Sequence, residues 1–180
     1  MVDQLKGIDP RVFDPNYSEP KTQGLNSGRD LITNVKQDFI SIVDSKDETL
    51  QFEAKVRNET LIVTVKTRGY QGDSEKRHPD LFAAQLVKKS LQFFELQGHS
   101  IHKWKDIWSK SGDLNDNYDQ FATYLRTHSS NGRELTQAEL VEAAKQTWTG
   151  QLANLLEFSK VESIDYRPNI GEVVIVFSKV

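Results

Sequence analysis

Three strand-like segments joined by short polar connections constrain the fold of this chain most. The middle one, Leu50–Val56, alternates strictly, so its apolar residues share one face of a strand and its polar residues the other. The apolar, β-branched Phe39–Val43 precedes it, and Leu61–Val65 follows it. Such short connections join antiparallel neighbours, because a parallel crossover needs about a dozen residues or more. The pattern therefore predicts an antiparallel meander with one buried face and one wetter face.

Helical patterns fill the centre of the sequence. One helix is predicted from Pro79 or Asp80 to Gly98, where a glycine ends the helix in the left-handed conformation at little steric cost. A second helix is predicted over Leu114–Leu125, because its apolar residues recur with helical spacing. Asp113 is placed to cap the first N–H groups of that helix.

A third helix is predicted to begin at Thr136-Gln-Ala-Glu139. This is the pattern of a capping box, in which the threonine and the glutamate each accept a hydrogen bond from the other's backbone N–H. Thr149-Gly150 is expected to kink or restart the helix. Its last part is then predicted to turn three leucines inward, namely Leu152, Leu155 and Leu156.

Two further strand signals, Val161–Tyr166 and Glu172–Phe177, close the chain. Segregated strands and helices predict an α+β fold with a mostly antiparallel five-stranded sheet, in the order βββ-ααα(α)-ββ, and with helices on one face. The last two strands are expected to join the meander in one sheet, since alone they would expose a very apolar pair. Residues 31–180 are predicted to form a single domain. Residues 1–30, with prolines at 10, 15 and 20, are predicted to be an irregular arm or linker.

Composition excludes several classes of protein. The 180 residues include no cysteine, which rules out disulfides, thiolate catalysis and cysteine-ligated zinc. The net charge of -3 is unlike that of a strongly basic nucleic-acid-binding protein. No apolar run is long enough to cross a membrane, and the N-terminus shows no signal peptide. The compartment stays open between the cytoplasm and export as part of a larger protein.

The segment Gly98–Lys110 is rich in histidine, tryptophan and lysine. His99 and His102 are three residues apart and would share one side of a helix, but we predict solvated imidazoles at the end of a helix and no metal site. Trp104 and Trp108 are four apart, so on a short helix they would lie together. Burial in the core is the favoured interpretation, rather than a platform that stacks on bases.

Acid–base chemistry on a phosphodiester needs two groups that titrate near neutrality and a cation beside the phosphate. The candidate catalytic residues for such chemistry are His99, His102 and His128, with Lys103 or Arg126 as the cation. His78 is a further histidine of the same kind. The sequence contains no motif for a nucleotide-binding loop or a serine nucleophile, and it predicts no cofactor.

The part of the chain from Ile101 to the end resembles a domain found at the C-termini of large bacterial polymorphic toxins and of related surface or effector proteins. The resemblance implies a bacterial origin, a modular C-terminal position and a role in delivery or interbacterial competition, without an assigned activity. Those domains carry a lysine where this chain has Gln151, which puts a cation at that position in doubt. The matching residues are Ile107-Trp108, Asp113, Asp116-Asn117-Tyr118, Phe121, Ala143-Ala144, Thr147-Trp148-Thr149-Gly150, Ala153 and Val174–Phe177.

Three functions follow as hypotheses. The first is a non-catalytic module that binds a protein partner or the upstream region of a longer chain, and it is the favoured one because no group of residues demands chemistry. The second is a metal-independent, nuclease-like toxin domain that uses the histidines, Lys103 and Arg126. The third is a small-ligand binder with a cavity between sheet and helices, lined by residues such as Phe52, Phe94 and Trp148.

Overall fold

The computed structural model describes residues 31–45, 51–66, 83–111, 116–129 and 132–180. The chain divides into two compact units, Met1–Ile101 and His102–Val180. Each unit has strands, helix and a hydrophobic core of its own. The predicted α+β class is confirmed, because seven antiparallel strands and four helices are present among these residues.

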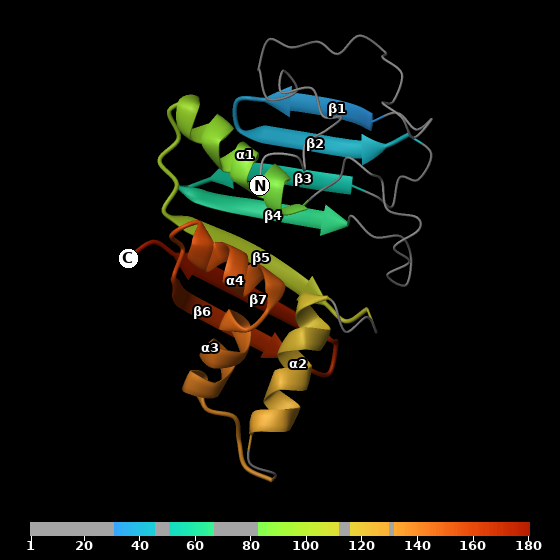
Figure 1. Ribbon diagram of the computed structural model, residues 1–180, viewed down its shortest axis with the longest axis vertical. Coiled ribbons are helices and arrows are strands. Elements are labelled where there is room, and N and C mark those ends of the chain that lie inside the picture. Colours follow the sequence, from blue (N-terminus) through green and yellow to red (C-terminus); the bar gives the residue numbers. More distant parts are fainter. Residues whose placement is uncertain (1–30, 46–50, 67–82, 112–115, 130–131) are drawn as a thin grey trace. The chain divides into compact units, whose positions relative to one another are not determined.

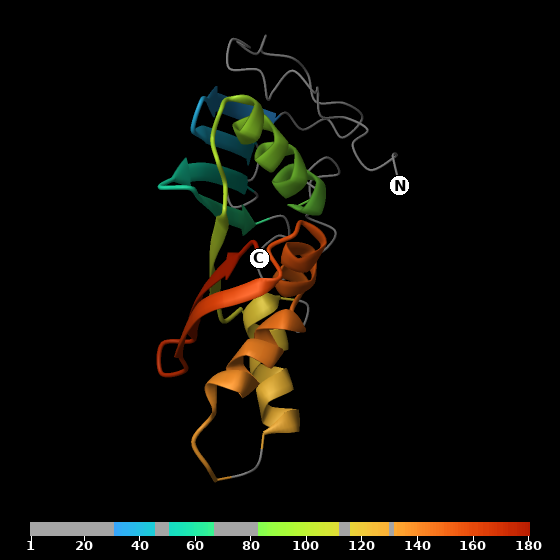
Figure 2. The same ribbon diagram turned by 90° about the vertical axis from the view of Figure 1, so that its left-hand side faces the viewer.

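The first unit is an antiparallel meander. Its strands are β1 (Leu31–Lys36), β2 (Phe39–Asp44), β3 (Gln51–Arg57) and β4 (Thr60–Lys66), and each pairs with its neighbour in sequence. The helix α1 (Ala83–Leu96) lies on one face of these strands (Figures 1 and 2). The predicted meander is thereby confirmed, with β1 as one strand more than the sequence pattern indicated.

The buried face of this meander follows from the alternation in β3. Phe52 and Ala54 are fully buried, and they pair across the strands with Ile42 and Ile40, which are also fully buried. The turn between β3 and β4 has only two residues, Asn58 and Glu59, with φ of 48° and 60°. Such left-handed pairs match the twist of a tight hairpin. The helix α1 completes this core with its buried side chains, Leu86, Val87, Phe93 and Phe94 among them.

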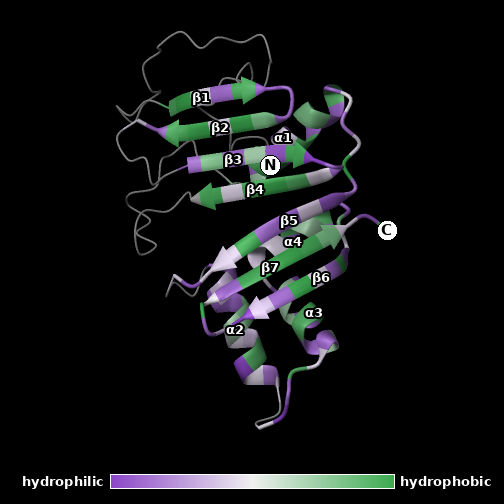
Figure 3. Ribbon diagram, turned by 180° about the vertical axis from the view of Figure 1, so that it is seen from behind, coloured by the Kyte–Doolittle hydropathy of each residue, from purple (hydrophilic) through white to green (hydrophobic). Residues whose placement is uncertain are grey.

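The second unit has a three-stranded antiparallel sheet in the order β5-β7-β6, with its three helices on one face (Figures 1 and 2). The central strand β7 is largely hydrophobic along its length (Figure 3), as the sequence predicted. The six elements are β5 (Lys103–Ser109), α2 (Asn117–His128), α3 (Gln137–Lys145), α4 (Trp148–Leu155), β6 (Lys160–Arg167) and β7 (Glu172–Ser178).

Aromatic side chains fill the core of the second unit. Trp104 of β5 lies opposite Phe177 of β7, with ring centroids 6.3 Å apart, and its ring meets the ring of Phe158 edge-on at 6.2 Å. Trp108 contacts Phe177 and Phe121 at 6.4 and 6.1 Å. Edge-on and tilted arrangements of this kind stabilise a core beyond the burial of their surface. The predicted burial of both tryptophans is therefore confirmed.

The prediction of a short helix around these tryptophans was wrong, because Lys103–Ser109 is strand β5. A spacing of four residues places two side chains on one face of a helix, but it does the same on a strand, where every second residue shares a face. With β1 and β5 added, the described strands number seven, so the predicted count of five was also wrong. The single domain over residues 31–180 stays a prediction, and residues 1–30 lie outside the described residues.

Several helix ends agree with the sequence patterns. Gly98 has φ of +90° and follows α1, and the N–H of His99 bonds to the carbonyl of Phe94 at 3.0 Å, as in a left-handed helix terminus. The start predicted near Pro79 and the cap predicted at Asp113 lie outside the described residues. In the structure Asp116 is the N-terminal cap residue of α2, and it makes no side-chain capping bond.

The predicted capping box of α3 is confirmed. Thr136 Oγ1 accepts from the N–H of Glu139 at 3.3 Å, and Glu139 Oε2 accepts from the N–H of Thr136 at 2.8 Å. The bond from the Thr136 N–H to the Glu139 carboxylate, a second one from the Thr136 hydroxyl at 2.9 Å, and the nearby Arg133 lower the pKa of Glu139. Thr136→Ala is expected to reduce the free energy of unfolding of the second unit by about 1 kcal/mol in urea denaturation. Gln137→Ala, which changes an exposed residue of the same turn, serves as the control and is expected to change it by less than about 0.5 kcal/mol.

Among the described helices, none has the length and apolar character needed to span a membrane.

Candidate functional site

The helix α4 is held tightly against the end of α3. Thr147 caps α4, since its Oγ1 accepts from the N–H of Gly150 at 3.0 Å and donates to the carbonyl of Ala144 at 2.7 Å. Gly150 lies so close to α3 that a Cβ atom there would stand 2.1 Å from the oxygen of Ala144. The small residues on this side of α4, Thr149, Gly150 and Ala153, are all buried. Close approach of the two backbones therefore sets which face of α4 is turned inward.

A polar centre joins α4 to β5 and α2. Asp106 lies between the two tryptophans on the helix-covered side of β5, and its Oδ2 accepts from Trp108 Nε1 at 2.8 Å and from Thr149 Oγ1 at 3.2 Å. Its Oδ1 accepts from the backbone N–H of Ile107 at 2.9 Å. Asn117 donates through Nδ2 to Thr149 Oγ1 and accepts from the N–H of Thr149, both at 2.8 Å. The carboxyl group of Asp106 thus connects β5 to α4, and Thr149 connects α4 to α2.

Burial raises the pKa of Asp106 from 3.8 to about 6. The hydrogen bonds from Trp108, Ile107 and Thr149 oppose this rise, because they stabilise the carboxylate, but they do not cancel it. A carboxyl group that titrates near neutrality is suited to acid–base catalysis. Here, however, both of its oxygens already accept hydrogen bonds from the protein itself. The geometry is that of a group that holds β5 and α4 together.

The backbone N–H groups at the N-terminus of α4 also donate their hydrogen bonds to side chains of the protein itself. The N–H of Trp148 donates to Gln120 Oε1 at 2.7 Å, the N–H of Thr149 to Asn117, and the N–H of Gly150 to Thr147. The segment Thr147-Trp148-Thr149-Gly150, which carries part of the resemblance to toxin domains, therefore uses these polar atoms to anchor α4 within the second unit.

The opposite face of α4 is turned outward. Trp148, Leu152 and Leu155 recur at the spacing of one helix face, and Trp148 is 39% exposed and Leu155 78% exposed. The prediction that Leu155 points inward was therefore wrong. The side of α4 that contacts α3 accepts only small side chains, so the leucine is turned away. We call Trp148, Leu152 and Leu155 the outer face of α4.

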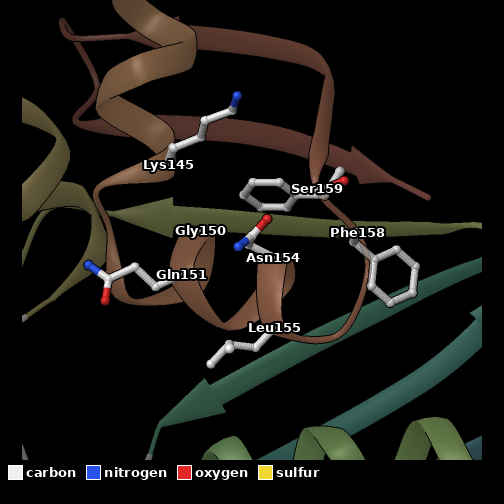
Figure 4. Close-up of a pocket in the computed structure, with 8 residues that line it drawn as sticks. Lys145, Gly150, Gln151, Asn154, Leu155, Phe158 and Ser159 are labelled. Carbon is white, nitrogen blue, oxygen red and sulfur yellow. The ribbon is translucent and has the colours of Figure 1, made fainter. Parts of the chain in front are cut away.

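A pocket of about 400 Å³ adjoins the outer face of α4 (Figure 4). Phe158 and Phe177 lie at its base but are 0% and 1% exposed, so they offer almost no surface to a ligand, whereas Leu155 is mostly exposed. Asn154 extends from α4 on the side on which Lys145 lies, whereas Leu155 extends on the other side. The pocket is within the size range of ligand-binding clefts, which is roughly 300–1,000 Å³. Its lining residues are Lys145, Gly150, Gln151, Asn154, Leu155, Phe158, Ser159 and Phe177.

Several polar side chains at the rim of this pocket are exposed to solvent. Within the part of the chain that the structure describes, Lys145 Nζ forms no ion pair or hydrogen bond, and neither the amide of Asn154 nor the hydroxyl of Ser159 has a hydrogen-bond partner. Gln151 uses its Nε2 to donate to the carbonyl of Gln146 at 3.3 Å. Lys179 Nζ lies 5.1 Å from the centroid of the Phe158 ring. The rim therefore combines one cation, Lys145, with neutral hydrogen-bonding groups.

The histidine candidates have separate surroundings. His99 belongs to the first unit, where its Nε2 donates to the carbonyl of Gln37 at 3.0 Å and its ring meets Phe94 edge-on at 6.1 Å. His102 is exposed, and its carbonyl accepts from the N–H of Lys179 at the start of β5. His128 ends α2 and stacks on Tyr124, with ring centroids 3.9 Å apart. His78 lies outside the described residues.

The two cationic candidates, Lys103 and Arg126, have partners other than His128 among the described residues. Lys103 forms an ion pair with Glu162 of β6 at 2.6 Å, whereas Arg126 donates to Thr123 within α2 at 3.1 Å. Lys103 lies at the start of β5, and α2 begins beside the other end of that strand and runs away from it (Figure 1). The structure thus does not bring Lys103 together with Arg126 or His128. The catalytic roles of these residues stay predictions.

No group of three or more potential metal ligands gathers among the described residues. Comparisons with protein-family models, with curated proteins and with solved structures find no match to this chain. The resemblance to toxin domains therefore stays a prediction.

The sequence patterns did not indicate the pocket or the polar centre. The pocket joins α3, α4, the segment after α4 and β7, and Asp106 is separated from Thr149 by 43 positions. One local signal was present, namely the small residues Thr149, Gly150 and Ala153 on one side of a helix. Small residues in that pattern indicate a close contact between helices, and so predict that the larger residues of the same helix face outward.

Proposed function

We propose that this chain is a protein-binding module, and that its partner binds the outer face of α4 together with the adjoining pocket. The observation that carries this proposal is the exposure of Leu155, 78%, and of Trp148, 39%, on one face of α4. Exposed apolar residues that lie beside one another and have a polar rim are typical of interaction sites.

The composition of this surface supports a protein as the partner. Trp148 contributes an amphipathic ring at the other end of the outer face, and tryptophan is enriched among the residues that dominate binding energies at protein interfaces. Leu152 lies between Trp148 and Leu155, so an elongated segment of a partner is able to contact all three. The net charge of -3 over the chain does not favour nucleic acid.

A selection of peptides on the full chain tests this proposal. Random peptides displayed on phage are selected against the protein, and the dissociation constants of synthetic copies are measured by fluorescence anisotropy. Leu155→Glu is expected to weaken binding by at least about tenfold, because it places a charge where an apolar group is buried on binding.

Leu96→Glu is the matched control, since Leu96 is an equally exposed leucine, at 85%, near the end of α1. It is expected to leave the dissociation constants unchanged within about twofold. Both variants should keep the thermal unfolding temperature of the protein, because both residues are exposed. Failure to enrich any peptide, or peptides that bind the Leu155→Glu variant as tightly as the native protein, would contradict the proposed function.

A further inference from the structure

We propose that Asp106 is a proton-dependent switch for α4: the helix stays in place while the carboxyl group is protonated, and it detaches from β5 more often once the group is ionised. The switch acts between two elements of the second unit, so it does not rest on the partner proposed above. It concerns the detachment of one helix while the strands of the unit stay paired.

The carboxyl group of Asp106 is enclosed by apolar and neutral groups. Its neighbours on the same face of β5, Trp104 and Trp108, are 1% and 3% exposed, and Ile175 of β7 is its partner across the sheet. Burial raises the pKa of Asp106 to about 6, and the other influences on it are hydrogen bonds from neutral groups. The ionised form is thus buried without a compensating positive charge from the described residues.

Titratable groups on the nearest elements lie on another face or have other partners. The helix α4 itself carries none. Lys103 and Lys105 are on the opposite face of β5, because alternate residues of a strand share a face. On α2, Asp116 and Asp119 accept hydrogen bonds from the hydroxyl of Ser111.

The remaining elements of the unit also direct their charged groups elsewhere. Arg167 of β6 pairs with Asp165 and with Glu172 of β7, and Glu142 of α3 accepts from Gln146. Tyr118 of α2 and Tyr166 of β6 contact each other, with ring centroids 6.4 Å apart. Glu139 of α3 is bonded to Thr136 and Arg133. Asp106 is therefore the titratable group whose charge α4 covers.

The hydrogen bonds to Asp106 are divided unequally between the strand and the helix. Trp108 Nε1 and the N–H of Ile107 belong to β5 itself, at 2.8 and 2.9 Å, whereas Thr149 Oγ1 of α4 donates at 3.2 Å. When α4 detaches, the carboxylate keeps both bonds from β5, loses the one from Thr149 and gains water. Closure of α4 over the ionised group exchanges that water for one neutral hydroxyl, which does not compensate for the lost hydration.

The protonated group fits the closed arrangement. A proton on Oδ2 lets the carboxyl group donate to Thr149 Oγ1, which has two lone pairs and also accepts from Asn117 Nδ2 at 2.8 Å. The link between β5 and α4 then persists without a buried charge. Ionisation releases the proton to solvent water. Because the closed state binds the proton more tightly than the open state, α4 should open more often as the pH rises from about 4 to about 6, and equally often above about 7.

Amide hydrogen exchange of the full chain, from about pH 4.5 to about pH 7.5 and corrected for the intrinsic effect of pH, tests this switch. The eight residues of α4 are too few for a stable isolated helix, so its amides exchange when it detaches. The opening constant of α4, read at the amide of Gln151, which bonds to the carbonyl of Thr147, is expected to rise by about tenfold or more. The amides of β7 should open at least about tenfold less often than those of α4.

Two results would overturn the switch. One is an opening constant of α4 that does not change with pH. The other is an opening constant equal to that of β7 at every pH, because α4 would then open only when the whole unit unfolds.

Asp106→Asn keeps the shape of the side chain and removes its titration. In this variant the opening constant of α4 is expected to change by less than about twofold over the same pH range. Asp165→Asn, at an exposed carboxylate of β6, is the control and should keep the rise of the native protein. A full rise in Asp106→Asn would assign the pH dependence to another group and so contradict the inference.

The native protein provides a second readout, which holds even if the variant fails to fold. The indole N–H of Trp108 donates to Asp106 Oδ2, so its NMR chemical shift reports the ionisation of the carboxyl group. The midpoint of that titration should agree, within about half a pH unit, with the pH above which the opening of α4 stops rising. An indole signal that does not titrate between about pH 4 and 7 would show that Asp106 keeps one charge state there, and the switch would be wrong.

Discussion

Gly150→Ala is expected to destabilise the second unit by about 3 kcal/mol or more, or to prevent it from folding. The added Cβ would stand 2.1 Å from the carbonyl oxygen of Ala144 and 2.9 Å from the Cα of Lys145, and both are backbone atoms. Since backbone atoms cannot rotate away as a side chain does, α4 must move off α3 as a whole. Overpacking of a well-packed core costs about 1–3 kcal/mol and sometimes more.

The measurement is urea denaturation followed by tryptophan fluorescence. It reports on the second unit alone, because all 3 tryptophans of the chain, at 104, 108 and 148, belong to that unit. Two controls separate the clash from other effects of alanine. Gln151→Ala changes an exposed residue of the same helix and should change the free energy of unfolding by less than about 0.5 kcal/mol.

Gly132→Ala is the second control. Gly132 has φ of +85° but no atom within 4 Å of an added Cβ. Its substitution should therefore cost only the strain of a left-handed alanine, about 1 kcal/mol. A loss at Gly150 no greater than this would show that the contact with Ala144 does not determine how α4 packs.

The second large effect concerns pH. The stability of the second unit is expected to fall as the pH rises from about 4 to 7, and Asp106→Asn is expected to remove that fall. Because burial raises the pKa of Asp106 from 3.8 to about 6, the folded state favours the protonated form. The contribution of this group to stability is therefore fully present below about pH 4 and is lost as the pH rises through about 6.

The size of the effect follows from the shift in pKa. Each unit corresponds to about 1.4 kcal/mol, so the shift amounts to at most about 3 kcal/mol, and partial exposure of Asp106 to water reduces it. The measurement is the free energy of unfolding of both proteins at several pH values between 4 and 8. Asp165→Asn, at an exposed carboxylate of β6, is the control that should keep the pH dependence of the native protein.

The opposite result is also informative. Asp106 accepts hydrogen bonds from Trp108, Ile107 and Thr149, and each favours the carboxylate. If these bonds outweighed burial, the stability would rise with pH and Asp106→Asn would remove that rise instead. A native protein and an Asp106→Asn variant with the same pH dependence would contradict the raised pKa.

Local patterns predicted local structure well. The alternation in Leu50–Val56 predicted the buried face of β3, and the capping box at Thr136 and Glu139 is present in the structure as predicted. Gly98 ends α1 in the left-handed conformation that its position indicated. Each of these features depends on a few neighbouring residues, so the information needed to predict it is contained in a short stretch of sequence.

The errors arose where a local pattern fits two structures. Trp104 and Trp108, four apart, share a face on a helix and on a strand, and only their pairing with Phe177 and Val173 of β7 makes the segment a strand. Leu155 was predicted to be buried because it is apolar. Its exposure depends on the contact between Gly150 and Ala144, which leaves room for small side chains alone.

By itself, the sequence determined the antiparallel meander, the α+β class, several helix ends and the exclusion of cysteine chemistry, because these follow from composition and from short-range periodicity. Only the tertiary structure decided that Asp106, Asn117 and Thr149 form one polar centre, and that Lys145, Asn154 and Phe177 border one pocket. The reason is physical. Which side chains meet depends on how closely helices and strands from distant parts of the sequence approach, and that distance is set by packing of the whole unit.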